Sequence, residues 1–190
     1  MIGKTDAIGT TYAVAPIPPD PAHTIWVEIG AMRIGVESRL LDDAALAANY
    51  SGDDLAEIEE AVGDGAIDDN GVSIHIEGVH DRHEYLRFDM FDHDPHYHYI
   101  HRSGESQTIV QFDRVAFGAM PGWVMTLLRD GTRGEGGRLR AMLAEVGGEH
   151  LLDDVDPVAL AERLLEVERL AGEAAAALAA GSRGAPRGRG

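Results

Sequence analysis

Apolar and polar residues alternate along several short runs in the first two thirds of the chain, the pattern of strands that bury one face. The first two runs lie within residues 24–37 and flank Gly30-Ala31, a pair that suits a two-residue type II′ hairpin turn. This turn places all six apolar residues of the two runs on one face and lays Trp26 over Gly35. The sequence therefore predicts an N-terminal hairpin.

Four further strand-like runs follow, with connections of about three to six residues that are typical of hairpins. They span residues 72–79, 83–91, 96–101 and 108–113. An acidic segment at 64–71, expected to be a turn, precedes them. Strands of this kind, met one after another along the chain, predict an antiparallel meander.

Helical periodicity appears first at 51–62, where Ser51 is a candidate N-cap, and then throughout the last third of the chain. There the expected helices begin near Pro121, span about 136–146, and run from 157 to 180. The predicted fold is α+β, an antiparallel meander of about six strands with C-terminal helices packed on one face. The expected organisation is a Pro-rich extended arm (1–22), one domain (23–181, with the sheet in 24–113 and the helices in 118–180) and a disordered basic tail (182–190).

Charge and composition exclude several classes of protein. The chain has 16 Lys and Arg residues and 33 Asp and Glu residues, which gives a formal net charge of −17. Such a charge repels nucleic acid and anionic membranes. The absence of cysteine excludes disulfides, thiolate metal sites and cysteine nucleophiles. The first residues lack the apolar run of a secretory signal, and no segment approaches the roughly 20 apolar residues of a membrane span. A cytoplasmic location is the expectation.

The most polar strand face comes from the runs 83–91 and 96–101. Leu86, Phe88 and Met90 share one face of the first run, which makes it the core face. A four-residue loop between the runs then pairs Asp89 with His98. A shift by one residue would instead bury the imidazoles among aliphatic side chains without partners, which is costly.

The same rule extends the polar face to the neighbouring strands. It predicts that His75 lies opposite Arg87, Glu77 opposite Tyr85, His98 beside Gln111 and His96 beside Asp113. One face of four strands then collects imidazole, carboxylate and guanidinium groups within reach of one another. These residues are His75, Glu77, Arg87, Asp89, His96, His98, Gln111 and Asp113.

Two imidazoles and a carboxylate are a common ligand set for divalent transition metals. His96, His98 and Asp89 form such a set and are expected to hold Zn, Fe, Mn, Ni or Cu. Asp113 is either a fourth ligand or a group that orients His96.

The remaining polar residues of this face are candidates for catalysis. His75 and Glu77 would be further ligands or general acid–base groups, and Arg87 would bind a carboxylate or phosphate of a small-molecule ligand. The alternative is that the histidines are solvated or hydrogen-bonded, and that Arg87 forms an ordinary ion pair with Asp89.

His96-x-His98, with Glu105 following, resembles the metal motif of cupins over about ten residues. The glycines and spacings that flank that motif are missing, and no second motif follows, so the sequence is not assigned to that family. A phosphate-binding loop and a Gly-x-Ser-x-Gly nucleophile elbow are also absent from the sequence.

Two functions of different classes follow. The first is a divalent-metal-binding protein or metal-dependent enzyme that uses the His/Asp cluster. The alternative is a non-catalytic interaction or assembly module. In that case the C-terminal helix, whose second half is rich in alanine, would bind another copy or a protein partner, and the Pro-rich arm would be a further docking segment.

Overall fold

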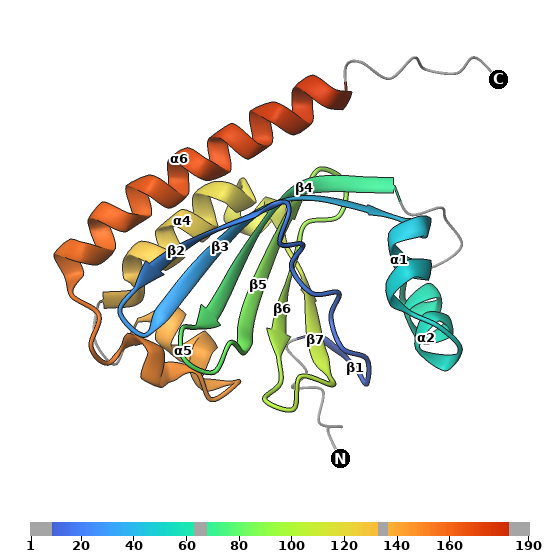
Figure 1. Ribbon diagram of the computed structural model, residues 1–190, viewed down its shortest axis with the longest axis horizontal. Helices are drawn as coiled ribbons and strands as arrows, with labels where there is room; N and C mark the ends of the chain where they lie inside the picture. The colour runs from blue at the N-terminus through green and yellow to red at the C-terminus, as the bar shows by residue number, and fades with distance from the viewer. Residues whose placement is uncertain (1–8, 63–67, 133–136, 183–190) are drawn as a thin grey trace.

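Seven antiparallel strands form one sheet in the computed structural model, which describes residues 9–62, 68–132 and 137–182 (Figure 1). The strand order is β1-β7-β6-β5-β4-β3-β2, so all neighbours except β1 and β7 are consecutive in the chain. This arrangement confirms the predicted α+β meander, with one strand more than expected. The strands are β1 (Thr10–Tyr12), β2 (Thr24–Ile29), β3 (Met32–Asp42), β4 (Asp68–Gly78), β5 (Glu84–Phe91), β6 (His96–Ile100) and β7 (Gln107–Gln111).

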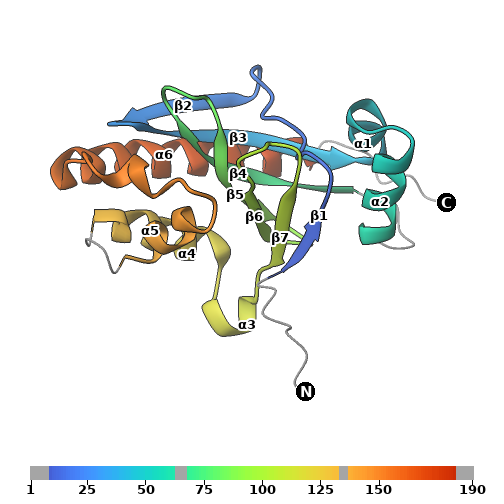
Figure 2. The same cartoon turned by 90° about the horizontal axis from the view of Figure 1, so that it is seen from below.

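The C-terminal helices α4 (Met120–Arg129), α5 (Arg138–Ala144) and α6 (Pro157–Ser182) cover the apolar face of the sheet (Figures 1 and 2). The short helix α3 (Arg114–Phe117) precedes them and has no buried residue, and 3-10 turns lie at Asp130–Thr132 and Glu149–Leu152. The predicted stripe of α6 is buried, and it joins the even-numbered side chains of β4 and β5 in one core. That stripe is Leu160, Leu164, Val167 and Leu170.

Two short helices lie at the opposite end of the molecule, where β3 and β4 extend beyond the other strands (Figure 1). The predicted helix is α2 (Asp53–Val62), which begins two residues later than expected. The helix α1 (Asp43–Asn49) was not predicted; the Asp42 carboxylate caps it by accepting the Ala45 N–H at 2.7 Å. Leu46 and Ile58 pack with Val14 in a second, smaller apolar cluster.

The hairpin register is confirmed, because Trp26 pairs with Gly35 and Ile29 with Met32. A Cβ atom at Gly35 would lie 2.7 Å from the Trp26 ring, so the indole occupies the space of the missing side chain. Gly30 has a φ of 60°, as the first position of a type II′ turn requires. Ile25 pairs with Val36 on the predicted face, but it is 55% exposed because β2 is the edge strand.

Two predicted registers were wrong by two residues. His96 pairs with Asp89 instead of Phe91, and it pairs with Gln111 on the other side instead of Asp113. A shift of two leaves every side chain on its predicted face, because strand side chains repeat with a period of two.

The register between β4 and β5 is confirmed at His75–Arg87 and then broken by a bulge. Glu77 pairs with Glu84 instead of Tyr85, so one extra residue turns Glu84 toward the polar face. Residues 68–71, also expected in a turn, instead begin β4. The remainder of that predicted turn, 64–67, lies outside the described residues.

The Pro-rich arm contains β1, which pairs with β7, and then crosses the polar face of the sheet on its way to β2 (Figure 1). It is therefore part of the packed structure from residue 9 onward, and residues 1–8 lie outside the described residues. Ser182 ends α6, and the rest of the predicted tail, 183–190, also lies outside them. No helix among the described residues has the length and hydropathy needed to cross a membrane.

Candidate metal centre

The polar face predicted from the sequence is present, and it is buried rather than open to solvent. Of its eight predicted members, Gln111 and Asp113 are exposed. The other six, and four further polar residues beside them, are 9% exposed or less, which requires that they be hydrogen-bonded or paired with opposite charges. They are Glu37, Arg39, Ser73, His75, Glu77, Arg87, Asp89, His96, His98 and Gln107.

Asp89, His96 and His98 meet at one point of this face. The Asp89 Oδ2 atom lies 2.9 Å from His98 Nε2 and 3.4 Å from His96 Nε2. One ligand atom of each residue lies within 4.8 Å of the others, a spacing suited to a shared metal ion. The two histidines share a face because they are two residues apart on β6, and Asp89 lies directly across from His96.

The ring nitrogens that face away from this point are held by oxygen acceptors. His96 Nδ1 donates to the Asp94 carbonyl at 2.7 Å, and His98 Nδ1 lies 2.7 Å from Gln107 Oε1. Ser73 Oγ donates to Asp89 Oδ1 at 2.5 Å. A carbonyl oxygen only accepts, so Nδ1 of His96 carries a proton, and Nε2, which faces the carboxylate, is the nitrogen that would give up its proton to a metal. Histidines that bind metals are oriented in this way by their outer neighbours.

The electrostatics of the three groups favour a carboxylate with a cation beside it. Burial opposes ionisation of Asp89, but hydrogen bonds from both histidines outweigh it and hold the pKa of Asp89 well below its usual value. Burial also works against a charged His96, yet the contact with Asp89 raises its pKa. For His98 burial prevails and its pKa is lowered, which favours the neutral ring that a metal requires.

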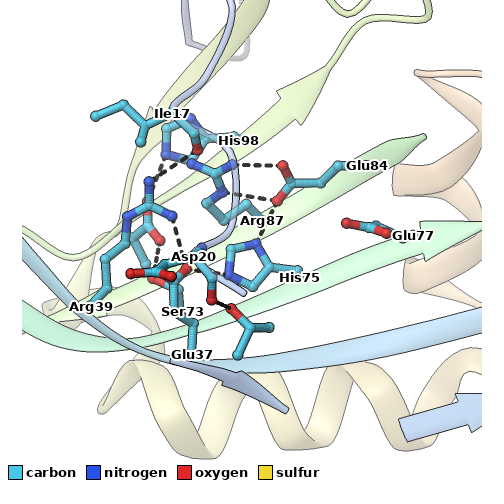
Figure 3. Close-up of polar contacts among 12 residues, drawn as sticks. Ile17, Asp20, Glu37, Arg39, Ser73, His75, Glu77, Glu84, Arg87 and His98 are labelled. Atoms are coloured by element: carbon cyan, nitrogen blue, oxygen red, sulfur yellow. Dashed lines mark hydrogen bonds and ion pairs between the residues drawn. The ribbon is translucent and has the colours of Figure 1, made fainter. Parts of the chain in front are cut away.

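His75 belongs to a separate network, which Figure 3 shows. Its Nε2 lies 2.8 Å from Glu37 Oε2 and its Nδ1 lies 2.6 Å from Glu84 Oε1. Both partners are carboxylate oxygens, so both ring nitrogens donate and the ring is an imidazolium. The residue is 0% exposed. It is therefore a bridging cation, with no free nitrogen to act as a base or ligand.

Arg87 and Arg39 complete this network. Arg87 donates to both oxygens of Glu84, from Nε at 2.9 Å and from Nη2 at 2.6 Å. Burial works against the Glu84 charge, but Arg87 and His75 outweigh it and lower its pKa to about 2. Arg39 donates to Glu37 at 3.0 Å and to the Ile17 carbonyl of the arm at 3.0 Å.

Two predicted site residues do not join the metal ligands. Glu77 forms an ion pair with Arg33, whose guanidinium also lies 3.8 Å from the centroid of the Trp26 ring. Asp113 lies past the end of β7, where its carboxylate caps α3 by accepting the Val115 and Ala116 N–H groups at 2.9 Å. Its exclusion follows from the two-residue shift, because Gln111 occupies the position opposite His96.

Sequence reasoning missed Glu37, Glu84, Ser73 and Gln107. Glu37 was detectable, since it alternates with Ile34 and Val36 and therefore lies on the polar face. Glu84 reaches this face only through the bulge, for which the sequence pattern gives no signal.

A cavity of about 690 Å³ opens beside the candidate metal ligands. This volume is typical of sites that bind small molecules. The candidate ligands line it together with Arg39, Arg87 and Gln107. The arm, α1, α2 and β7 add Tyr50 and apolar side chains, chiefly Ile17, Leu46, Ile58 and Ile109. Asp68, Asp69, His93 and Asp94 also line it.

Neither a curated protein nor a solved structure matches the sequence. A family profile covers most of the domain, including all five strands from β3 to β7 and the three candidate ligands. The chain belongs to the family described as domain of unknown function DUF7700, whose profile matches residues 26–171.

Proposed function

We propose that the protein binds a divalent transition metal through Asp89, His96 and His98, and that the metal acts on or holds a small molecule in the adjoining cavity. One observation supports this most directly. Both histidines direct Nε2 toward one carboxylate oxygen, while an oxygen acceptor holds each Nδ1.

The ligand set limits the metal and its chemistry. Two imidazoles and one carboxylate suit iron or zinc and leave coordination positions open for a substrate or water. Manganese, nickel and copper remain in the proposal. An open position beside a cavity favours an enzyme that polarises or activates a bound oxygen group over a closed structural site.

The proposal gives the three predicted catalytic residues unequal roles. Arg87 lines the cavity and lies close to Asp89, so it contributes positive charge to the site. His75 and Glu77 are engaged with Glu37, Glu84 and Arg33. We propose that these two position their neighbours and do not touch the substrate.

The test is the metal content of protein purified without a His-tag, measured by elemental analysis. The expected result is about one equivalent of metal, lost in Asp89→Asn and in the double variant His96→Gln/His98→Gln. The control is His23→Gln/His80→Gln, which removes two exposed histidines and is expected to leave the metal content unchanged.

A second measurement protects the test against misfolding. Zinc at about 100 times its dissociation constant adds roughly 2.7 kcal/mol to the free energy of unfolding. For a chain of this size that shift raises the melting temperature by about 5–10 °C. The proposal is wrong if the folded protein contains no metal and none of the Zn, Fe, Mn, Ni or Cu salts raises its melting temperature.

The alternative, an assembly module, keeps one observation in its favour. Val158 and Leu165 are 67% and 66% exposed on α6 and are seven residues apart, so they lie on one outer stripe. The inner stripe of α6 is already used by its own sheet. A mass in solution above that of one chain, reduced by Leu165→Glu, would support assembly. The cytoplasmic location also remains a prediction.

A further inference from the structure

A metal requires both histidines to be neutral, and with His96 and His98 neutral the remaining charges of the buried polar face can be counted. Arg39, His75 and Arg87 supply three positive charges, where His75 counts as charged because both of its nitrogens face carboxylate oxygens. Glu37, Glu84 and Asp89 supply three negative charges. The ion pair of Glu77 with Arg33 adds none. These groups therefore sum to zero under the arm.

A divalent metal on Asp89 and two neutral histidines would leave this region with two uncompensated positive charges. Burying unpaired charge is costly, and an anion that enters the site with its charge next to the metal removes that cost. A neutral ligand would leave the excess in place, and a cationic ligand would increase it. The charge balance therefore favours an anion.

The three other acidic residues that line the cavity, Asp68, Asp69 and Asp94, do not reverse this balance. Asp69 accepts the N–H groups of Asn70, His93 and Asp94, which compensate its charge. The Asp94 side chain is 65% exposed, and Asp68 is exposed as well, so water and salt screen both carboxylates.

The rest of the cavity requires an apolar body on the ligand. Ile17 from the arm, Leu46 from α1 and Ile58 from α2 line the cavity and come from three separate segments. Leu46 and Ile58 are 5% and 7% exposed. Contact with such a wall stabilises a hydrocarbon chain or ring by removing it from water.

We propose that the ligand of this site is a small organic anion with an apolar body. Its carboxylate, or a similar oxygen anion, binds the metal at Asp89, His96 and His98, and its hydrocarbon part lies against Ile17, Leu46 and Ile58. The inference rests on the proposed function, since the metal supplies the excess positive charge.

The test uses cobalt-loaded protein, because the visible spectrum of Co²⁺ reports a new ligand. Octanoate, octan-1-ol, octylammonium and acetate are titrated in turn by calorimetry and by absorption. Octanoate is expected to bind at least tenfold more tightly than each of the other three and to change the cobalt spectrum. Each methylene between acetate and octanoate is expected to add up to about fourfold in affinity.

Matched variants locate the apolar end of the site. Ile17→Ala, in the cavity wall, is expected to weaken octanoate at least threefold and to leave acetate unchanged. The control is Ile25→Ala, which removes the same atoms from an isoleucine that is 55% exposed on β2 and does not line the cavity. The affinities for octanoate and for acetate should both stay unchanged in this variant.

The outcomes separate the two proposals. If the protein takes up cobalt but octan-1-ol or octylammonium binds as tightly as octanoate, the anionic class is wrong and the metal centre stands. If Ile17→Ala leaves octanoate binding unchanged, the apolar wall has been misassigned. If the folded protein takes up no cobalt, the metal centre is wrong and this inference fails with it.

Discussion

Each ionisable side chain of the polar face is held by a specific partner of opposite charge or by a hydrogen-bond acceptor. His75 shows the consequence most clearly, because it is fully buried between two carboxylates. Removing one member of a buried ionic network leaves its partners charged and unpaired. The resulting loss of stability is usually larger than the net stabilisation that the intact network provides.

Replacing His75 with Gln is therefore expected to destabilise the protein by about 3–5 kcal/mol, because Glu37 and Glu84 would lose the cation between them. Urea unfolding measures the loss. His80→Gln, in an exposed turn, is the control and is expected to change the unfolding free energy by less than about 0.5 kcal/mol. Equal effects of the two substitutions would contradict the network.

Two glycines provide a second prediction at this scale. At Gly35 a Cβ would lie 2.7 Å from the Trp26 ring, so Gly35→Ala is expected to destabilise the protein by about 1–3 kcal/mol. Gly172, inside α6, has no atom within 4 Å of an added Cβ, so Gly172→Ala is expected to stabilise by up to about 1 kcal/mol. Thermal unfolding of the two variants should shift in opposite directions.

Among the elements, the arm depends on contacts with structure that follows it in the chain. The Tyr50 hydroxyl at the end of α1 donates to the Ala15 carbonyl at 2.8 Å, and the Asp20 N–H donates to Glu37 at 3.2 Å. Together with the Arg39–Ile17 contact, these hydrogen bonds hold the arm across the cavity.

Tyr50→Phe removes one of these hydrogen bonds and keeps the ring. Amide hydrogen exchange of residues 13–19 is expected to become several-fold faster, while exchange in β4 and β5 stays unchanged. Tyr12→Phe, which leaves the Ala15 contact in place, is the control. Faster exchange across the whole sheet would indicate general destabilisation instead of a loosened arm.

The faces of the strands were predictable, whereas the alignments of β5 with β6 and of β6 with β7 were not. Alternation at Leu86, Phe88 and Met90 assigns the core face, and this assignment survives any shift by an even number of residues. Hydrophobic pattern alone therefore cannot distinguish His96 opposite Asp89 from His96 opposite Phe91. The bulge between Ile76 and Glu77 is a local insertion of the same kind, with no hydrophobic signature.

The candidate ligands were predicted in spite of this error. Asp89 contacts both histidines because in the observed register it lies directly opposite His96, with His98 two residues along the same face. Asp113 was lost for the same reason, since the shift places it beyond β7. The burial of the face was not predictable from the strands, because it depends on where the arm lies.

At the scale of the whole molecule, the buried network makes the free energy of unfolding fall at both low and high pH. The pKa of Glu84 falls from 4.5 to about 2 on folding, so its contribution is complete above about pH 4.5 and is lost as the pH falls through about 2. The pKa of His75 is raised above 6.5, because Glu84 and Glu37 outweigh burial. Its contribution is complete below pH 6.5 and is lost as the pH rises through the folded pKa.

The stability that the network supplies is therefore expected to be largest between about pH 4.5 and 6.5. Unfolding free energies across pH 2–9 for the protein and for Glu84→Gln measure it by difference. The acid limb of that difference should amount to roughly 3 kcal/mol, from a shift of about 2.5 pH units in one carboxyl. A difference that does not change with pH would contradict the assignment.

The pairing of β1 with β7 joins Thr11 to Thr108, 97 positions apart. During synthesis the arm leaves the ribosome long before its partner strand exists, whereas each strand from β2 to β7 pairs with the strand next to it in the chain. Closing so long a loop is slow compared with forming hairpins. We therefore expect the arm to dock last, after the histidines and Asp89 have met, so that an ion can enter from the open side before the chain closes over it.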